Sequence, residues 1–168
     1  MNPVLDAIHK RRSVRDFTAD TVERETLIQI IRAGTRAPSG LNNQPWRFAI
    51  VTDKDLKARI AKLTRYEKVI EGSRALIPVF IDRDAVYHEL KDYQAIGACI
   101  QNMLLAAYSL GLGAVWLGEI LKNSDQVRYL LGLSENFALM AVLALGHPAH
   151  RKQTSTRKSL EETIIFEK

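Results

Sequence analysis

Hydrophobic residues along this chain fall into two patterns that predict helices and strands. Apolar positions spaced three to four residues apart predict short helices over residues 4–10, 21–33, 55–63 and 125–131. Short apolar runs predict strands over residues 47–52, 75–81, 114–117 and 139–145. The strands show no regular βαβ alternation, and no Gly-x-Gly-x-x-Gly motif follows the first of them. We therefore expect an α+β fold, with helices flanking a central mixed or antiparallel sheet.

The longest apolar stretch, residues 94–112, predicts a long central helix. Its apolar residues cover nearly the whole circumference, which is typical of a helix that is buried or spans a membrane. Gln94, Gln101, Asn102 and Ser109 interrupt what a membrane span would need. We expect a buried core helix that a partner chain could share, and no membrane association.

Residues that commonly cap or end helices, or that interrupt strands, predict where these elements begin and end. Gly34 is expected to stop the second helix, and Asp53 and Ser124 are expected to act as N-caps. Pro78 lacks a backbone donor and predicts either an edge strand or an irregularity. The polar segment 82–91 is expected to be a loop with at most one helical turn.

Composition limits the classes of protein that this chain can be. Its 168 residues fit one domain, 1–168, and its net charge of +5 is spread along the chain, which favours a phosphate-bearing small ligand at least as much as nucleic acid. The lone cysteine, Cys99, excludes an internal disulfide and lies in an apolar stretch, so a buried, inert thiol is expected. The first residues lack the pattern of a signal peptide, and a cytoplasmic location is expected.

Two polar segments are candidates for a binding site. Residues 11–15, Arg-Arg-Ser-Val-Arg, place three cations and a hydroxyl together, which suits a phosphate group, although a solvated basic helix end would look the same. Residues 38–46 join two prolines through Ser, Gly, Asn and Gln to Trp46, which predicts a recognition loop; the alternative is a structural turn anchored by the tryptophan. Together they suggest a ligand with an anion and a planar polar ring.

Acid–base candidates are sparse. The four histidines are scattered and support no catalytic dyad, and Glu119 could equally contact a ligand or face solvent. Asp82, Asp84 and His88 could hold a metal in principle, but a solvated loop is the simpler interpretation, and we expect no metal site. Binding elements without a catalytic dyad indicate that a cofactor carries the chemistry.

Five blocks, in this order, resemble the nitroreductase family of flavin enzymes. They are RRSVRDF at 11–17, APSGLNNQPWRF at 37–48, AIGACIQNMLLAAYSLGLGAVWLG at 95–118, ALMAVLALGHP at 138–148 and RK at 157–158. The resemblance spans almost the whole chain. It implies an FMN-dependent NAD(P)H oxidoreductase, built as a homodimer with FMN at the subunit interface.

The resemblance also implies a role for individual residues. Arg11, Ser13 and Arg15, with Arg12 as a further participant and Arg157 from the tail, would hold the flavin phosphate and ribityl chain. Pro38, Ser39, Gly40 and Asn43 would come from the partner chain to line the ring, and Leu117, Gly118 and Glu119 would lie beside it. The apolar end of the tail is expected to pack on the partner subunit.

The implied reaction is a ping-pong hydride transfer from NADH or NADPH, through the flavin, to a small acceptor such as a nitroaromatic, quinone or enone. No side chain is expected to be catalytic in its own right. The segment 82–91 is shorter than the corresponding excursion in many family members, so the pocket is expected to be shallow. The alternatives are a flavin-binding storage or sensor protein without turnover, and a small basic nucleic-acid-binding module.

Overall fold

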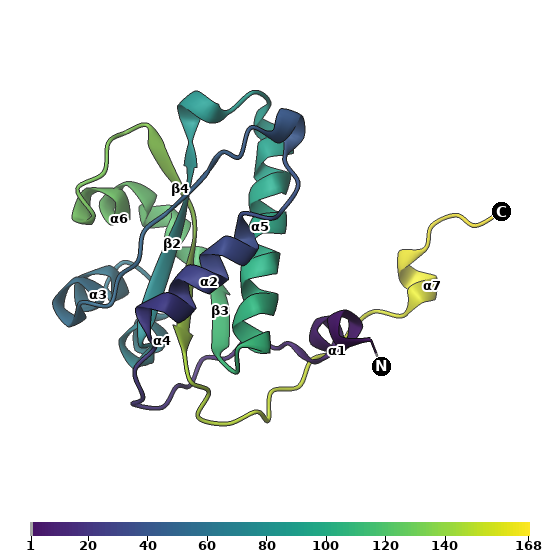
Figure 1. Cartoon of the computed structure of the whole chain (residues 1–168), viewed down its shortest axis with the longest axis horizontal. Helices are drawn as coiled ribbons and strands as arrows, with labels where there is room; N and C mark the ends of the chain where they lie inside the picture. The colour runs from purple at the N-terminus through teal and green to yellow at the C-terminus, as the bar shows by residue number, and fades with distance from the viewer. Residues whose placement is uncertain (1) are drawn as a thin grey trace.

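The computed structural model describes residues 2–168, which form a four-stranded antiparallel sheet with helices on both faces (Figure 1). The strands are β1 Trp46–Phe48, β2 Ala75–Asp82, β3 Gly113–Leu117 and β4 Phe137–Gly146, in the order β1-β2-β4-β3. The helices are α1 Pro3–Lys10, α2 Arg24–Gly34, α3 Lys54–Ala61, α4 Glu67–Gly72, α5 Glu89–Ser109, α6 Ser124–Leu130 and α7 Leu160–Thr163. Short 3-10 turns occupy η1 Gly40–Asn42, η2 Arg83–Ala85 and η3 Glu119–Asn123. The predicted α+β fold is confirmed.

Two apolar cores fill the space between the sheet and its two helical layers. On one face, α2 and the central helix α5 cover side chains such as Ile77 and Leu143. On the other face, α3, α4 and α6 cover side chains such as Leu76 and Val142. Neighbouring strand residues point to opposite faces, so the continuous apolar run of β4 reflects burial on both sides. This confirms the predicted strand and the predicted core helix.

Several helix boundaries differ from the expected ones. α2 begins at Arg24 rather than residue 21, and α5 begins at Glu89, so the polar connection before it is shorter than expected. Ser124 is the first residue of α6 rather than its N-cap, whereas the Asp53 side chain does accept a hydrogen bond from Leu56 N over 2.7 Å. Gly34 closes α2, but its φ is not positive; a Cβ there would meet α5. α4, η3 and α7 had no recognised sequence signal.

Pro78 lies in a central strand, which corrects the expected edge position. β2 sits between β1 and β4, and its register with β4 shifts between Val79 and Phe80, so the predicted irregularity is present. On the other side β1 ends at Phe48, opposite Val79, although it had been expected to reach residue 52. Because Pro78 has no N–H, it cannot donate the next ladder bond, and its carbonyl only accepts from Ala49 N at 3.0 Å.

Both ends of the chain extend beyond the layered body. α1 and the tail that carries α7 project from the same side, next to the C-terminal end of α5 (Figure 1). The apolar residues of this tail are solvent-exposed in the single chain, with Ile165 98% and Phe166 78% exposed. Within residues 2–168, none of the helices combines the length and hydropathy that crossing a lipid bilayer requires.

Candidate functional site

The predicted cluster of cations lies where the chain leaves α1 and runs beside the edge strand β3. Arg11 N donates to Ala7 O over 2.9 Å at the end of the helix, and Val14 N donates to Ala114 O over 3.0 Å. Val14 is only 4% exposed, so this short segment is firmly anchored. The cluster lines a cavity of about 400 Å³ whose wall consists of Arg11, Arg12, Ser13 and Arg15 together with Gln153, Thr154, Ser155 and Arg157 from the tail.

The cavity beside the cluster is strongly cationic and carries no carboxylate in its wall. Arg12 donates to His9 O over 2.6 Å, but the Nε atoms of Arg11 and Arg12 are buried without a hydrogen-bond partner among residues 2–168. Burial lowers the pKa of Arg11, and the neighbouring charges of Arg12 and Arg157 lower it further. Guanidinium groups held together without counter-charges are suited to bind an anion.

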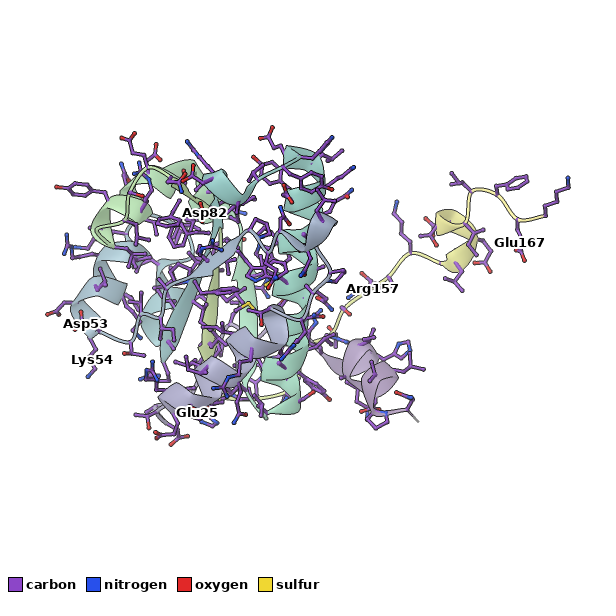
Figure 2. All side chains as sticks on the ribbon, turned by 45° about the horizontal axis from the view of Figure 1, so that its top comes forward. Glu25, Asp53, Lys54, Asp82, Arg157 and Glu167 are labelled. Atoms are coloured by element: carbon purple, nitrogen blue, oxygen red, sulfur yellow. The ribbon has the colours of Figure 1, made fainter. Side chains whose placement is uncertain are left out.

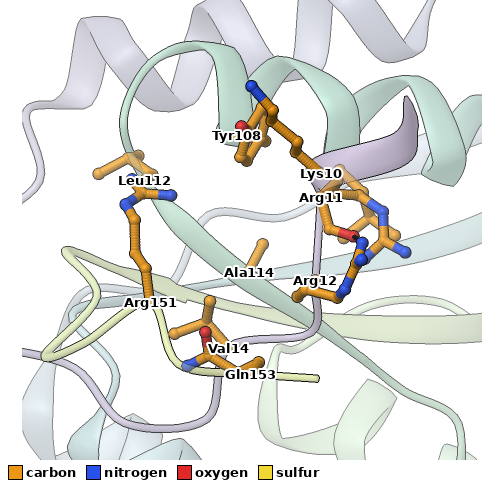
Figure 3. A pocket seen from close by; sticks show the side chains of 10 residues that line it. Lys10, Arg11, Arg12, Val14, Tyr108, Leu112, Ala114, Arg151 and Gln153 are labelled. Carbon is orange, nitrogen blue, oxygen red and sulfur yellow. Dashed lines mark hydrogen bonds between the residues drawn. The ribbon is translucent and has the colours of Figure 1, made fainter. Parts of the chain in front are cut away.

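A second hollow, of about 280 Å³, adjoins the first and shares Arg11, Arg12 and Gln153 with it. Figure 3 shows Arg11 and Arg12 on one side and Arg151 on the other, with Tyr108 at its rim. Arg151 donates to Gly111 O over 2.8 Å, and its guanidinium carbon lies 5.8 Å from the centroid of the Tyr108 ring. The positive region therefore extends from the cluster to the C-terminal end of α5.

The predicted recognition loop, residues 38–46, runs into β1 at Trp46, and its segment 38–44 has an unusual backbone. Leu41, Asn42 and Gln44 have positive φ values of 52°, 54° and 47°, a region that side chains other than glycine rarely adopt. Leu41 is also 85% exposed, so burial of its side chain does not explain this conformation. Strained backbone of this kind is typical of functional sites and persists only where neighbouring contacts impose it.

Asn43, between Asn42 and Gln44, is held by Asp92, a carboxylate that is fully buried in α5. Its oxygens accept hydrogen bonds from Asn43 Nδ2 at 2.7 Å and from the backbone N–H groups of Tyr87 and His88, each at 3.0 Å. Burial opposes the ionised form of Asp92, but these donors prevail and lower its pKa. Asp92 thus ties the loop to the start of α5. Neither spacing nor composition identified it, because a lone aspartate within a helical segment has no distinctive signal.

The third predicted group lies at the end of β3. Leu117 is buried, and Gly118 leads into η3. The Glu119 carboxylate accepts from Thr64 Oγ1 at 2.6 Å and forms an ion pair with Lys122 at 2.5 Å. The Lys122 ammonium and the Thr64 hydroxyl lower the pKa of Glu119 to about 2. The side chain of Glu119 is therefore occupied within its own chain, which leaves main-chain groups as the available contacts of this segment.

These groups do not form one site within a single chain. The hollow beside the cation cluster includes Leu104 and Tyr108, near the C-terminal end of α5. The hollow beside the loop includes Gln94 and Ala98, near the N-terminal end of the same helix. At 1.5 Å per residue, the midpoints of these two pairs of residues are about 15 Å apart along the helix axis. Arg11, Arg12, Ser13, Arg15 and Arg157 gather around one cavity, whereas Pro38, Ser39, Gly40 and Asn43 lie elsewhere.

Other potential reactive groups carry no site. Among the described residues, no three His, Cys, Asp or Glu side chains are close enough together to hold a metal ion. Asp82 instead accepts from Arg47 at 2.6 Å and from Asn136 at 2.6 Å. Cys99 is buried, as expected, and burial raises the pKa of its thiol to about 12.

Comparison with known proteins decides the family. The model of the nitroreductase family matches residues 8–78 and 68–147, which together span most of the chain. This chain belongs to the nitroreductase family. Five ordered sequence blocks predicted that assignment, and the match confirms it.

Individual relatives extend the match along the whole chain. A protein from Archaeoglobus fulgidus, named as an NADH dehydrogenase/NAD(P)H nitroreductase, is 32% identical over 155 residues, which cover 90% of this chain and 89% of the relative. The NADPH-flavin oxidoreductase of Vibrio harveyi is 32% identical over 94% of this chain and 70% of its own length. A Desulfovibrio desulfuricans nitroreductase, solved in complex with FMN, is 45% identical, with a TM-score of 0.96 and coverage of 100% and 98% of the two chains.

Proposed function

We propose that this chain is the protomer of a homodimeric, FMN-dependent NAD(P)H oxidoreductase that reduces a small acceptor such as a nitroaromatic, a quinone or an enone. The predicted enzyme class and cofactor are confirmed by the family match, by relatives named as flavin oxidoreductases and by the FMN-bound relative. The dimer, the residues of the site, the ping-pong order and the acceptor class are the proposal itself.

The observation that carries this proposal is the carboxylate-free cavity beside Arg11, Arg12 and Arg15. It offers guanidinium groups, the Ser13 hydroxyl and Arg157, which is the donor set that a terminal phosphate requires. The buried and unpartnered Nε atoms of two arginines indicate that an anion completes the site. These residues fit the phosphate of FMN, with Gln153, Thr154 and Ser155 adding polar groups that sequence analysis had not identified.

A second copy of the chain would supply the ring-binding half of the site. The loop with Pro38, Ser39, Gly40 and Asn43 is too far along α5 to reach the cations of its own chain. Exposed apolar residues lie on the projecting α1 and on the tail, where a second chain could bury them. They are Val4, Leu5 and Ile8 of α1 and Leu160, Ile164, Ile165 and Phe166 of the tail.

When bound, FMN would supply the hydride-transfer chemistry between NAD(P)H and a second substrate, in the proposed ping-pong order. The protein would contribute binding and orientation. Its arginines would hold the phosphate, and the backbone of Leu117, Gly118 and Glu119 would lie beside the ring, with the Glu119 side chain held by Thr64 and Lys122. No side chain is required to act as acid or base.

Comparison of FMN with riboflavin tests the phosphate cavity. FMN should bind much more tightly than riboflavin, which lacks the phosphate, and the difference should shrink at high salt. Light scattering should show a particle of two chains, given the 19.0 kDa mass of one chain. Equal affinity for both flavins would contradict the assignment of the cavity, and a monomer that binds FMN fully would contradict the shared site. Tight FMN binding without reduction by NADH or NADPH would favour the storage or sensor alternative.

A further inference from the structure

The loop at 38–44 shares its hollow with residues that the family blocks do not include. Pro38, Ser39 and Gly40 form one side, and Tyr87, Lys91 and Gln94 form the other. Tyr87 comes from the short connection before α5, and the other two come from the first turns of that helix. The connection that was expected to leave the pocket shallow therefore contributes an aromatic ring and a cation to its wall.

Tyr87 is held in place against the loop. A Cβ added to Gly40 would lie 2.1 Å from the Tyr87 hydroxyl oxygen, so the phenol ring rests directly on the glycine backbone. The backbone N–H of Tyr87 donates to the buried Asp92, which also accepts from Asn43 of the loop. One carboxylate thus fixes the backbone on both sides of the hollow, and the phenol packs on Gly40.

Lys91 is a cation without a counter-charge. Its Nζ lies 5.5 Å from the centroid of the Tyr87 ring, and across residues 2–168 no carboxylate lies within 4 Å of it. The two acidic residues nearest to Lys91 in sequence bond to other groups. Glu89 accepts a hydrogen bond from the Tyr93 hydroxyl, and the buried Asp92 accepts one from the backbone N–H of His88. The ring orients the ammonium at the rim and leaves it free to contact an anionic ligand.

We propose that Tyr87 and Lys91 form an anion-recognising corner of the substrate pocket, so that favoured acceptors carry a carboxylate or sulfonate beside the reducible group. This inference rests on the proposed function, which places the loop at 38–44 beside the flavin ring. The lysine attracts the charge of the acceptor, and the Tyr87 hydroxyl can donate to the same anion. The aromatic face beside them suits a planar acceptor ring.

Binding of benzoate and benzamide to the oxidised, FMN-loaded protein tests the inference directly. The two probes have the same ring and similar size but differ in charge. In Lys91→Gln, calorimetry should show benzoate binding weakened about three- to tenfold, while benzamide binding is unchanged. Tyr87→Phe should weaken benzoate by a smaller factor. In the wild type, added salt should reduce the preference for benzoate.

Lys54→Gln is the matched control, because it removes the same charge from an exposed residue of α3 on the side of the molecule away from the tail (Figure 2). It should leave both affinities unchanged. An unchanged benzoate affinity in Lys91→Gln, or an equal loss for benzoate and benzamide, would overturn the inference. Visible absorbance of the bound flavin should confirm that both variants retain FMN.

Steady-state kinetics provide an independent readout. The ratio of kcat/KM for 4-nitrobenzoate to that for 4-nitrobenzamide should fall in Lys91→Gln by the same factor as the benzoate affinity. Slower reduction by NADH with an unchanged acceptor ratio would mean that Lys91 serves the electron donor, and would overturn the inference.

Should the wild type fail to bind FMN, the proposed function fails, and ligand-detected NMR with the flavin-free protein decides the role of Lys91 separately. Selective benzoate binding that is lost in Lys91→Gln would retain the anion-recognising corner. No such binding would reject it as well.

Discussion

Replacement of Arg11 by methionine should have opposite effects on cofactor binding and on the stability of the flavin-free protein. Its guanidinium group is partly buried, its Nε has no partner among the described residues, and burial together with Arg12 and Arg157 lowers its pKa. Without a bound anion, Arg11 therefore lowers the free energy of unfolding of the protein. Methionine keeps the apolar stem of the side chain and removes the charge.

The expected magnitudes follow from these contacts. Loss of a charge-assisted phosphate contact costs about 1.5–3 kcal/mol, which should raise the Kd for FMN by about 10- to 150-fold. Arg11→Met removes a buried Nε that has no hydrogen-bond partner, and it removes like-charge repulsion. These changes should raise the free energy of unfolding of the flavin-free protein by up to about 1 kcal/mol, or about 2–4 °C in Tm. Titration of flavin fluorescence measures the first effect, and calorimetry at matched protein concentration measures the second.

Lys68→Met is the control for both measurements, since it removes one positive charge from an exposed position of α4. It should change neither quantity appreciably. The reasoning is refuted if Arg11→Met binds FMN as tightly as the wild type does. It is also refuted if the flavin-free variant is less stable than the wild type, because Arg11 would then contribute to the fold rather than to an anion site.

Three further predictions concern the stability and reactivity of the folded chain. Because the pKa of Glu119 is lowered to about 2, its interactions stabilise the fold above about pH 4.5 and are lost as the pH falls toward 2. In Glu119→Gln, circular dichroism should therefore show a smaller loss of stability over this pH range than in the wild type. The Cys99 thiol, whose pKa is raised to about 12, should react with Ellman's reagent only after unfolding in denaturant. Gly34→Ala should destabilise the protein by about 1–3 kcal/mol in denaturant titrations, because its Cβ would lie 2.6 Å from Met103 Cγ. Gly72→Ala is the control and should be neutral or stabilising, because its Cβ would meet no atom within 4 Å. Equal effects of the two substitutions would contradict the packing argument.

Apolar periodicity was sufficient to predict the main elements of the fold, because packing in both layers follows it. The continuous run of β4 is buried on both faces, and α5 is apolar around most of its circumference, so their patterns were distinctive. α4 has one fully buried residue, Ile70, and its few contacts are not evident in the sequence. Pro78 was assigned correctly as an irregularity but not as part of a central strand, because the order of the strands depends on pairing between segments far apart in the sequence.

The sequence predicted the cation cluster but not the long-range hydrogen bonds around the loop. Arginines close together in sequence remain close in space, so the cation cluster was evident from residues 11–15. The Asp92 carboxylate acts through Asn43, which is 49 residues away, and no local pattern reports such a pair. Tyr87 and Lys91 were missed for the same reason, because their role depends on how the connection before α5 folds over Gly40.

Anaerobic titration of the purified protein with NADH and then with NADPH, followed by visible absorption, tests the central claim most directly. The account predicts a yellow protein, or one that becomes yellow on addition of FMN, whose flavin absorbance bleaches with one or both nucleotides and returns when a quinone or nitro compound is added. A protein that takes up no FMN, or whose bound FMN stays oxidised with both nucleotides, would contradict it.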